Sequence, residues 1–277
     1  MLIDEEPLDK LLNRAPARLA ARLLHPTPVT PNQVSAFAGF LGLAAGVAIA
    51  IGTPAARLAA AGLLWGHLIF DCADGELARR RGGGSRSGAV VDGLADGLVI
   101  ISMHVGLLVL ALRTAAWPAW VAACVLAVAG ISMLVHAGLF DASKQRFRAT
   151  LGRAPAWSET PEQLRDEIAR ADTPSERRVL RLYAAYAGSQ RLWGRWLAGR
   201  EGISQLEFLA WTLLGPTTRT TILAAAVAVS IREPLALLAY PAFGLVFGNV
   251  WMAALLVVRR IRPRLPSREH GTESARP

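Results

Sequence analysis

The chain contains only two cysteines, few aromatic residues (7%) and few charged residues (18%). Cys72 and Cys124 lie far apart in apolar runs, so neither a disulfide framework nor a cysteine-rich metal site is indicated. The first ten residues, MLIDEEPLDK, are acidic and lack the basic, apolar and small-residue order of a secretory signal peptide. We therefore expect membrane insertion to depend on a later apolar segment.

Apolar side chains make up 53% of the 277 residues, and several runs approach the roughly 20 residues that cross a bilayer. We therefore predict an all-α, polytopic integral membrane protein with six transmembrane helices. Two small-xxx-small pairs, Gly42/Gly46 and Gly244/Gly248, favour close packing of the first and last spans against other helices. The expected spans cover residues 33–51, 57–70, 88–112, 117–140, 206–231 and 234–258.

The formal net charge of +9 has two possible explanations. In a soluble protein it would indicate nucleic acid, but in an apolar chain the positive-inside rule and anionic lipid headgroups explain it, so we expect no nucleic-acid partner. Of the 30 Lys and Arg residues, only Arg57, Arg113 and Arg232 fall at the three short connections. This asymmetry places both termini and the 79–87 loop in the cytoplasm, with the spans in the cell (inner) membrane.

The segments predict a juxtamembrane region (1–32), four spans (33–140), a polar insert (141–205), two further spans (206–260) and a cytoplasmic tail (261–277). Residues 7–24 place leucines among Lys and Arg, a pattern typical of an amphipathic helix on the membrane surface, although a solvated leader also fits. Thr30, Pro31 and Asn32 are typical of a helix start and predict where the first span begins.

The 141–205 insert is too polar to cross a bilayer, and we expect a cytoplasmic helical segment. Asp141 continues the fourth helix, Thr160-Pro161 opens a short helix to about Ala171, and Thr173-Pro174 opens a longer one that Gly199 ends. The longer helix carries tyrosines and tryptophans at helical spacing between arginines. This pattern indicates an interfacial helix or, alternatively, the core of a small soluble subdomain.

Four aspartates lie at the ends of two apolar runs, where an unpaired carboxylate is costly. Asp71 and Asp74 are three residues apart and share a helix face, while Gly88, Asp92 and Asp96 are each four apart and form a stripe on the next helix. The loop between them is short, so the two helices must be antiparallel neighbours. Facing carboxylate stripes predict a site for Mg²⁺ or a similar divalent ion, with two ions about 4 Å apart as a plausible arrangement.

Three further residues beside the aspartates fit a phosphoanhydride ligand. Gly75 and Gly88 remove side chains where a bulky ligand could approach the backbone. Arg79 can bind phosphate while reducing repulsion among the carboxylates. An ion transporter would not need these three residues in this register.

The pattern D-x2-D-G-x2-A-R-x8-G-x3-D-x3-D is matched at every fixed position. With this pattern, the Pro31-Asn32 helix start and the six-span layout, the sequence strongly resembles the CDP-alcohol phosphotransferase family of integral membrane enzymes. The matching residues are Asp71, Asp74, Gly75, Ala78, Arg79, Gly88, Asp92 and Asp96. The resemblance does not clearly extend to the 141–205 insert.

The resemblance implies transfer of a phosphoryl-linked group from a CDP-alcohol to a second alcohol, with release of CMP. It implies that Asp71, Asp74, Asp92 and Asp96 bind the metal, Mg²⁺ or Mn²⁺, and that Asp96 also acts as general base. It also implies a homodimer. Asn32 could contact the donor or only cap a helix. The residues implied for the cytidine diphosphate pocket are Gly75, Ala78, Arg79 and Gly88.

The acceptor alcohol is the least determined part. Family members that use inositol phosphate or glycerol phosphate tend to carry compact arginine patterns on the fourth span. The corresponding region of this chain reads HAGLFDASKQRF instead. We favour CDP-diacylglycerol as donor with a polar acceptor in phospholipid biosynthesis; the alternative is transfer of a CDP-linked headgroup to a lipid alcohol. A cation transporter and a scaffold with a degenerate site are the competing classes. Residues that could hold an acceptor phosphate, or only anchor the helix at the membrane surface, are His136, Asp141, Lys144 and Arg148.

Overall fold

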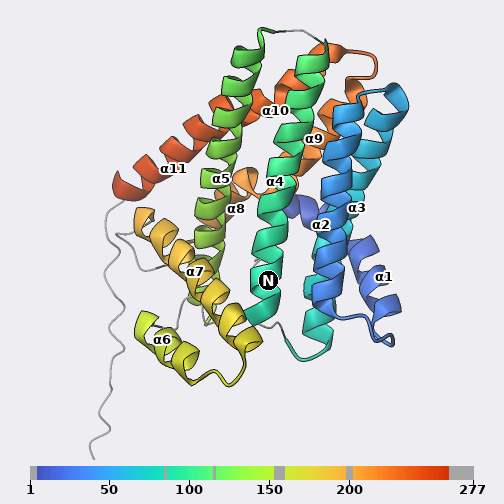
Figure 1. Cartoon of the computed structure of the whole chain (residues 1–277). Coiled ribbons are helices and arrows are strands. Elements are labelled where there is room, and N and C mark those ends of the chain that lie inside the picture. The colour runs from blue at the N-terminus through green and yellow to red at the C-terminus, as the bar shows by residue number, and fades with distance from the viewer. Residues whose placement is uncertain (1–4, 84–85, 115–116, 153–159, 198–201, 262–277) are drawn as a thin grey trace, which may run out of the picture.

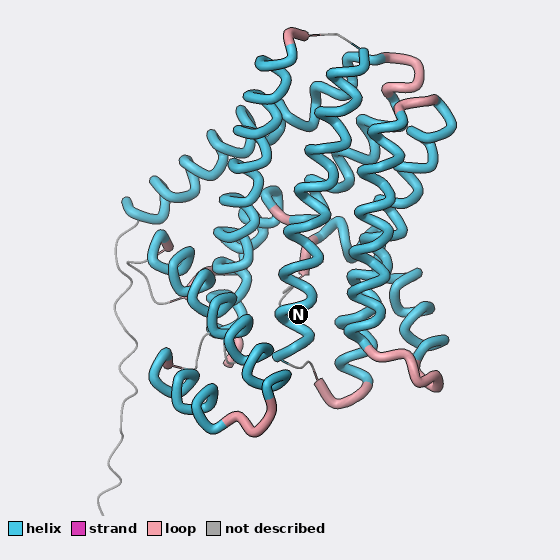
Figure 2. The backbone as a smooth tube through the Cα atoms, viewed as in Figure 1, coloured by secondary structure: helices cyan, strands magenta, loops and turns pink. Residues whose placement is uncertain are grey.

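A computed structural model describes residues 5–83, 86–114, 117–152, 160–197 and 202–261 of the chain. Long helices lie side by side in Figure 1, and the tube in Figure 2 is helical along most of its length, with no strand among these residues. The predicted all-α class is confirmed. The first half comprises a π-helical turn η1 (Asp9–Asn13) and helices α1 (Arg14–Leu24), α2 (Pro31–Ile51), α3 (Pro54–Arg80), α4 (Arg86–Thr114) and α5 (Ala119–Thr150).

The second half contains two helices outside the bundle and a broken C-terminal part. The two helices expected in the insert are α6 and α7, while the predicted end of the second at Gly199 lies outside the described residues. The helices of this half are α6 (Pro161–Arg170), α7 (Pro174–Trp196), α8 (Gln205–Trp211), η2 (Thr212–Leu214), α9 (Pro216–Val229), η3 (Pro234–Leu238), α10 (Ala239–Ala242), η4 (Phe243–Phe247) and α11 (Gly248–Ile261).

The expected fifth span, residues 206–231, is not one helix. Gly215 adopts an extended conformation (φ −71°, ψ 163°) and caps α9, whose first residue is Pro216. Proline has no backbone N–H and its ring clashes with the preceding turn, so a helix from α8 cannot continue through this position. The break shortens the apolar helix to the 14 residues of α9.

Four helices are long and apolar enough to cross a membrane: Pro31–Ile51, Gly88–Thr114, Ala119–Thr150 and Pro234–Ile261. The chain is therefore described as an integral membrane protein with four candidate spans. Helix α3 runs alongside them but carries Arg57 near its start and Asp71 and Asp74 near its end, which reduces its apolar character. The predicted count of six spans thus stays a prediction.

Threonine followed by proline starts four of the helices. Thr30, Thr53, Thr160 and Thr173 each accept a hydrogen bond from the backbone N–H three residues later, at the starts of α2, α3, α6 and α7. The next residue is proline in each case, which has no N–H to leave unsatisfied in the first turn. The predicted starts of these helices at Thr30, Thr160 and Thr173 are confirmed.

Helices α2 and α4 pack closely because small residues line their contact. Gly42 lies against Val99, and Gly46 lies against Ser102, so that a Cβ at either position would clash. A Cβ on Gly106 would lie 2.3 Å from the backbone oxygen of Gly46. The predicted small-xxx-small pair Gly42/Gly46 is thus used between helices of the same chain.

The second pair is used in the same way. A Cβ on Gly244 would lie 2.7 Å from Met133 Cε, and one on Gly248 would lie 2.4 Å from His136 Cε1, both on α5. These glycines let the bent C-terminal helices approach α5. Neither small-residue pair is therefore needed to explain contact with a second protein molecule.

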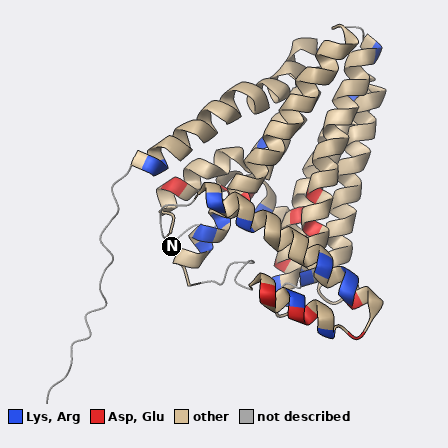
Figure 3. Ribbon diagram, turned by 60° about the vertical axis from the view of Figure 1, so that its left-hand side comes forward, with Lys and Arg blue, Asp and Glu red and all other residues tan. Residues whose placement is uncertain are grey.

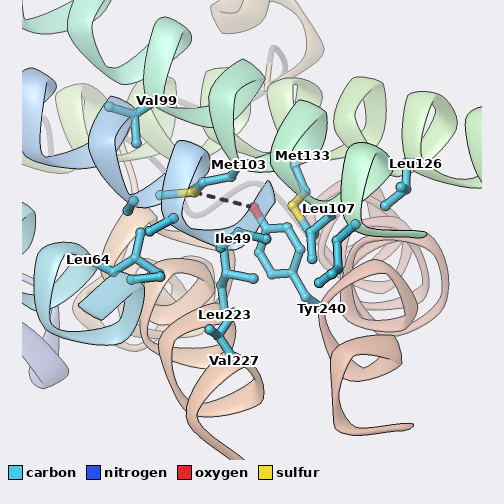
Figure 4. Packing of buried hydrophobic residues seen from close by; sticks show 14 residues of the cluster. Ile49, Leu64, Val99, Met103, Leu107, Leu126, Met133, Leu223, Val227 and Tyr240 are labelled. Carbon is cyan, nitrogen blue, oxygen red and sulfur yellow. Dashed lines mark hydrogen bonds between the residues drawn. The ribbon is translucent and has the colours of Figure 1, made fainter. Parts of the chain in front are cut away.

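The main core lies where the bundle helices meet, around Tyr240 of α10 (Figure 4). The Tyr240 hydroxyl approaches Met103 Sδ of α4 at 3.9 Å. Ile49 of α2, Leu64 of α3 and Leu223 of α9 are fully buried in the same cluster. Because this cluster joins helices from both halves of the chain, it fixes the positions of α2, α3 and α4 relative to one another.

Helix α1 lies against α3 through its small residues. Ala17 and Ala21 are fully buried, whereas Leu11, Leu19 and Leu23 are 78%, 57% and 66% exposed. The predicted N-terminal helix is confirmed, and these three leucines face away from the protein. That orientation suits a helix at the membrane surface, since the exposed leucines can enter the bilayer while the alanines contact α3.

The contact between α2 and α4 can be tested with one methyl group. Gly106→Ala places a Cβ against backbone and should lower the free energy of unfolding by about 1–3 kcal/mol, as overpacking does in other cores. Gly62→Ala is the matched control, because nothing lies within 4 Å of a Cβ there. Thermal unfolding in detergent measures both; equal transition temperatures for the two variants would contradict the close contact.

Candidate metal and substrate site

The four aspartates lie on α3 and α4, which both pack along α2 rather than mainly on each other, so the prediction of directly packed neighbouring helices is wrong. Asp71, Asp74 and Asp92 each offer a carboxylate oxygen, and these oxygens all lie within 4.8 Å of one another. Asp74 is buried, Asp71 is half-buried and Asp92 is exposed. Asp96 is half-buried and interacts electrostatically with the other three, although it is outside the group of three donors. The structure therefore brings together three of the predicted ligands, with Asp96, the predicted base, beside them.

Such a cluster is unfavourable without a cation. Two full charges 4.8 Å apart repel by about 3 kcal/mol at an effective dielectric constant of about 20, and three such pairs meet here. Hard carboxylate oxygens are the ligands that Mg²⁺ and Mn²⁺ prefer. The donor set of Asp71, Asp74 and Asp92 therefore fits a divalent metal ion.

Ser35 of α2 is a site residue that the sequence analysis missed. Its buried hydroxyl donates a hydrogen bond to Oδ2 of Asp74. This contact orients the most buried carboxylate of the cluster and connects it to α2. A signal was present, since Ser35 is a polar residue in an apolar run and continues the small-residue face of Gly39 and Gly42.

Arg79 lies at the edge of the cluster, as predicted, with its side chain 53% exposed. Its Nη2 donates to Oε2 of Glu76 at 3.1 Å, and Glu76 also pairs with Arg80 at 3.0 Å. Glu76 was not singled out from the sequence, although its spacing of three and four residues from two arginines on one helix predicts these pairs. Glu76 thus holds Arg79 beside the aspartates.

The predicted ligand-facing small residues line the same end of the bundle. A Cβ on Gly75 would meet only Arg79 Nη1, at 3.5 Å, so protein packing does not require glycine here. Ala78 and Gly88 are half-buried, on α3 and at the start of α4. Asn32 is half-buried in the first turn of α2. The space beside Gly75 is consistent with an approaching ligand.

Helix α7 borders the cluster on the α4 and α5 side. The Tyr186 ring packs on Gly93, next to Asp92, with Cε2 3.2 Å from where a Cβ would be. Asp141 of α5 accepts hydrogen bonds from Tyr186 (3.3 Å) and from Gln190 (2.6 Å). The two α7 residues were not singled out for binding, because their approach to Asp141 depends on how distant segments pack.

Lys144 and two histidines have different roles in the structure. Lys144 interacts electrostatically with Asp92 and Asp141, so it lies near the site. His136 instead bonds through Nε2 to Asn249 Oδ1 at 3.0 Å, and His67 bonds through Nδ1 to the Ala38 oxygen at 3.0 Å. Both histidines are buried and join helices, and His67 also interacts electrostatically with Asp96.

The N-terminal segment reaches the same end of the bundle. Asp9 accepts hydrogen bonds from Thr217 of α9 (2.7 Å) and Asn13 (2.9 Å), and it interacts electrostatically with Asp71. Burial, and then the nearby Asp9, raise the pKa of Glu6 to about 8. Glu6 is therefore largely protonated at neutral pH. The sequence showed an acidic segment but not that it folds back to the aspartates.

Comparison with known proteins agrees with this geometry. Residues 28–156 match the family model of CDP-alcohol phosphatidyltransferases. Phosphatidylinositol phosphate synthases of Mycobacterium tuberculosis and Mycobacterium bovis are 40% identical over 90 residues. That alignment covers 32% of this chain and 40% of the curated relatives, so it spans less than half of their length. The matched family region contains the whole aspartate motif.

The fold also has a solved counterpart. The crystal structure of the Mycobacterium tuberculosis phosphatidylinositol phosphate synthase in complex with manganese and citrate superposes with a TM-score of 0.51 and 18% sequence identity. The superposition covers 89% of this chain and 90% of that one. The shared fold thus extends well beyond the region of sequence similarity.

The carboxylate cluster predicts tight divalent-cation binding that depends on each ligand. Asp71→Asn and Asp92→Asn should each weaken Mn²⁺ binding at least about 10-fold, since even outer-shell partners of metal ligands contribute that much. Electron paramagnetic resonance of free Mn²⁺ measures binding to the purified protein. Asp172→Asn, on an exposed aspartate away from the cluster, is the control. Unchanged affinity in both ligand variants would exclude this metal site.

Proposed function

We propose that this chain, whose residues 28–156 match the family model of CDP-alcohol phosphatidyltransferases, belongs to that family and transfers a phosphatidyl group from CDP-diacylglycerol to a polar alcohol. CMP is the second product. The observation that carries this proposal is the group of carboxylate oxygens from Asp71, Asp74 and Asp92, within 4.8 Å of one another inside the matched region. A diphosphate donor is the ligand class that such a cluster, with cations, recognises.

The surroundings of the aspartates support a lipid as donor. Leu94 and Leu98, which alternate with Asp92 and Asp96 along α4, are 54% and 52% exposed. The apolar outer face of α4 therefore begins at the level of the carboxylates. Acyl chains can lie against this face while the diphosphate reaches the site, which favours CDP-diacylglycerol over a transfer of a CDP-linked headgroup to a lipid alcohol.

The donor pocket is assigned to residues that leave space or supply positive charge. Gly75, Ala78 and Gly88 would face the cytidine diphosphate, because they present little or no side chain beside the cluster. Arg79 would exchange its contact with Glu76 for a phosphate oxygen. Asn32, in the first turn of α2, would contact the donor from the opposite helix.

The chemistry is an in-line displacement at the β-phosphorus. Divalent cations, two of Mg²⁺ or Mn²⁺, would supply neutralisation of the diphosphate and of the departing CMP. Asp71, Asp74 and Asp92 would hold them, with Asp96 close by. Asp96 accepts the proton of the acceptor hydroxyl while the hydroxyl oxygen forms its bond to the β-phosphorus. The bond to the oxygen bridging the two phosphorus atoms breaks, and CMP leaves with that electron pair.

We further propose six membrane crossings, with α3 as the second and the broken segment from α8 through α9 as the fifth. In the ribbon of Figure 3, most of the segments coloured for Lys, Arg, Asp and Glu lie toward one end of the molecule. By the positive-inside rule that end, with the site, α6 and α7, faces the cytoplasm. We retain the five predicted regions of the chain and the homodimer as proposals. The phosphatidylinositol phosphate synthases among the relatives make inositol phosphate a first acceptor to test.

The role of Asp96 gives a direct test. Asp96→Asn removes the proton acceptor but not the three ligands, so CDP-diacylglycerol binding should persist while CMP release falls by about 10²–10⁴-fold. CMP release is measured in liposomes with a panel of CDP-alcohols and acceptors. Asp166→Asn, on exposed α6, is the matched control. Near wild-type CMP release by Asp96→Asn would remove the base assignment, and no CMP release by the wild type with any pair would contradict the proposed function.

A further inference from the structure

Helix α7 is held beside the site by contacts with α4 and α5. Arg86, at the start of α4, pairs with Glu167 of α6 and lies 5.5 Å from the ring centre of Tyr183 on α7. Trp193 fills the space beside Gly138 of α5, where a Cβ would lie 2.4 Å from the indole. These contacts exclude the alternative of a separate soluble subdomain. Figure 1 shows α7 beside the lower parts of α4 and α5.

Three polar side chains meet between α7 and α5, close to the aspartate cluster. Oδ2 of Asp141 accepts from both the Tyr186 hydroxyl and Nε2 of Gln190. Asp141 and Tyr186 both interact electrostatically with Asp92 and Asp96. The trio therefore lies beside the proposed base, on the side of α4 that faces α7.

The orientation of Gln190 points to an absent partner. Gln190 is 5% exposed, and its Oε1 has no hydrogen-bond partner among the described residues. The amide cannot be reversed, because the oxygen would then face the Asp141 carboxylate and lose the 2.6 Å bond. A buried carbonyl oxygen without a donor is unfavourable unless a ligand or water supplies one.

We propose that Asp141, Tyr186 and Gln190 form a subsite for hydroxyl groups of a polyhydroxylated acceptor, which makes α7 a determinant of acceptor specificity. The inference rests on the proposed function, since it concerns the second substrate of that reaction. Carboxylate and amide oxygens accept from alcohol O–H groups, while the phenol can accept or donate. Burial raises the pKa of the Tyr186 phenol, so the phenol stays protonated as a donor at physiological pH.

The subsite predicts selectivity between acceptors that differ by one hydroxyl. Glycerol 3-phosphate and propane-1,3-diol monophosphate have the same reacting primary alcohol, but only the first has a neighbouring hydroxyl. Inositol 1-phosphate and a deoxy analogue give a second pair. A hydrogen bond of ordinary strength gives a preference of about 10-fold for the hydroxylated member of a pair.

The test combines acceptor analogues with variants of the two α7 residues. For Tyr186→Phe and Gln190→Leu, the KM of the best acceptor should rise about 10-fold and the preference within its pair should disappear. The KM of CDP-diacylglycerol and the unfolding temperature should stay near wild type. Ser189→Ala is the control, because this exposed hydroxyl bonds only the Tyr186 backbone oxygen.

The outcomes separate the possible failures. Retained acceptor preference in both α7 variants overturns the subsite, as does an equal rise in the KM of donor and acceptor, which marks a merely structural contact. Equilibrium binding of radiolabelled inositol 1-phosphate and glycerol 3-phosphate is measured in parallel. Loss of binding in the variants supports the subsite, and binding equal to wild type, or no binding by the wild type, overturns it. Absent CMP release by the wild type instead contradicts the proposed function.

Discussion

The central constraint on this structure is the mutual repulsion of the clustered aspartate carboxylates at one end of the helix bundle, which the rest of the protein must offset. Asp71, Asp74 and Asp92 can be held within 4.8 Å only where the helices that carry them are rigidly placed and a cation offsets their charge. The glycine contact between α2 and α4 and the core around Tyr240 supply that rigidity. Ser35 then orients Asp74 from a third helix. The packing of the helices therefore determines the positions of the carboxylates on which the chemistry depends.

Two features outside the family motif complete the site. The N-terminal segment folds back, so that Asp9 bonds Thr217 while α1 covers α3 with its alanines. On the other side, α7 crosses α4 and α5 and brings Tyr186 to Asp141. The motif thus lies between the N-terminal segment and α7, two segments far apart in the sequence.

Local patterns predicted much of this arrangement. Helical spacing placed Asp71 and Asp74 on one helix face and Asp92 and Asp96 on the next helix, but it did not predict that α2 packs against both helices. Threonine–proline pairs predicted the starts of α2, α6 and α7. The break at Pro216 was not predicted, because the fifth span was assigned from its apolar residues and the helix-breaking effect of the proline was not considered. The contacts of Glu6, Tyr186 and Gln190 could not be predicted, since they depend on which distant segments meet.

The central claim is that α3 and α4 together hold a divalent cation through these aspartates. Anomalous diffraction at the manganese edge, from crystals of the full chain grown with Mn²⁺, tests it most directly. The account predicts manganese peaks within coordination distance of Asp71, Asp74 and Asp92, adjacent to Asp96. Peaks found only elsewhere, or an ordered aspartate cluster without manganese at saturating concentration, would contradict it.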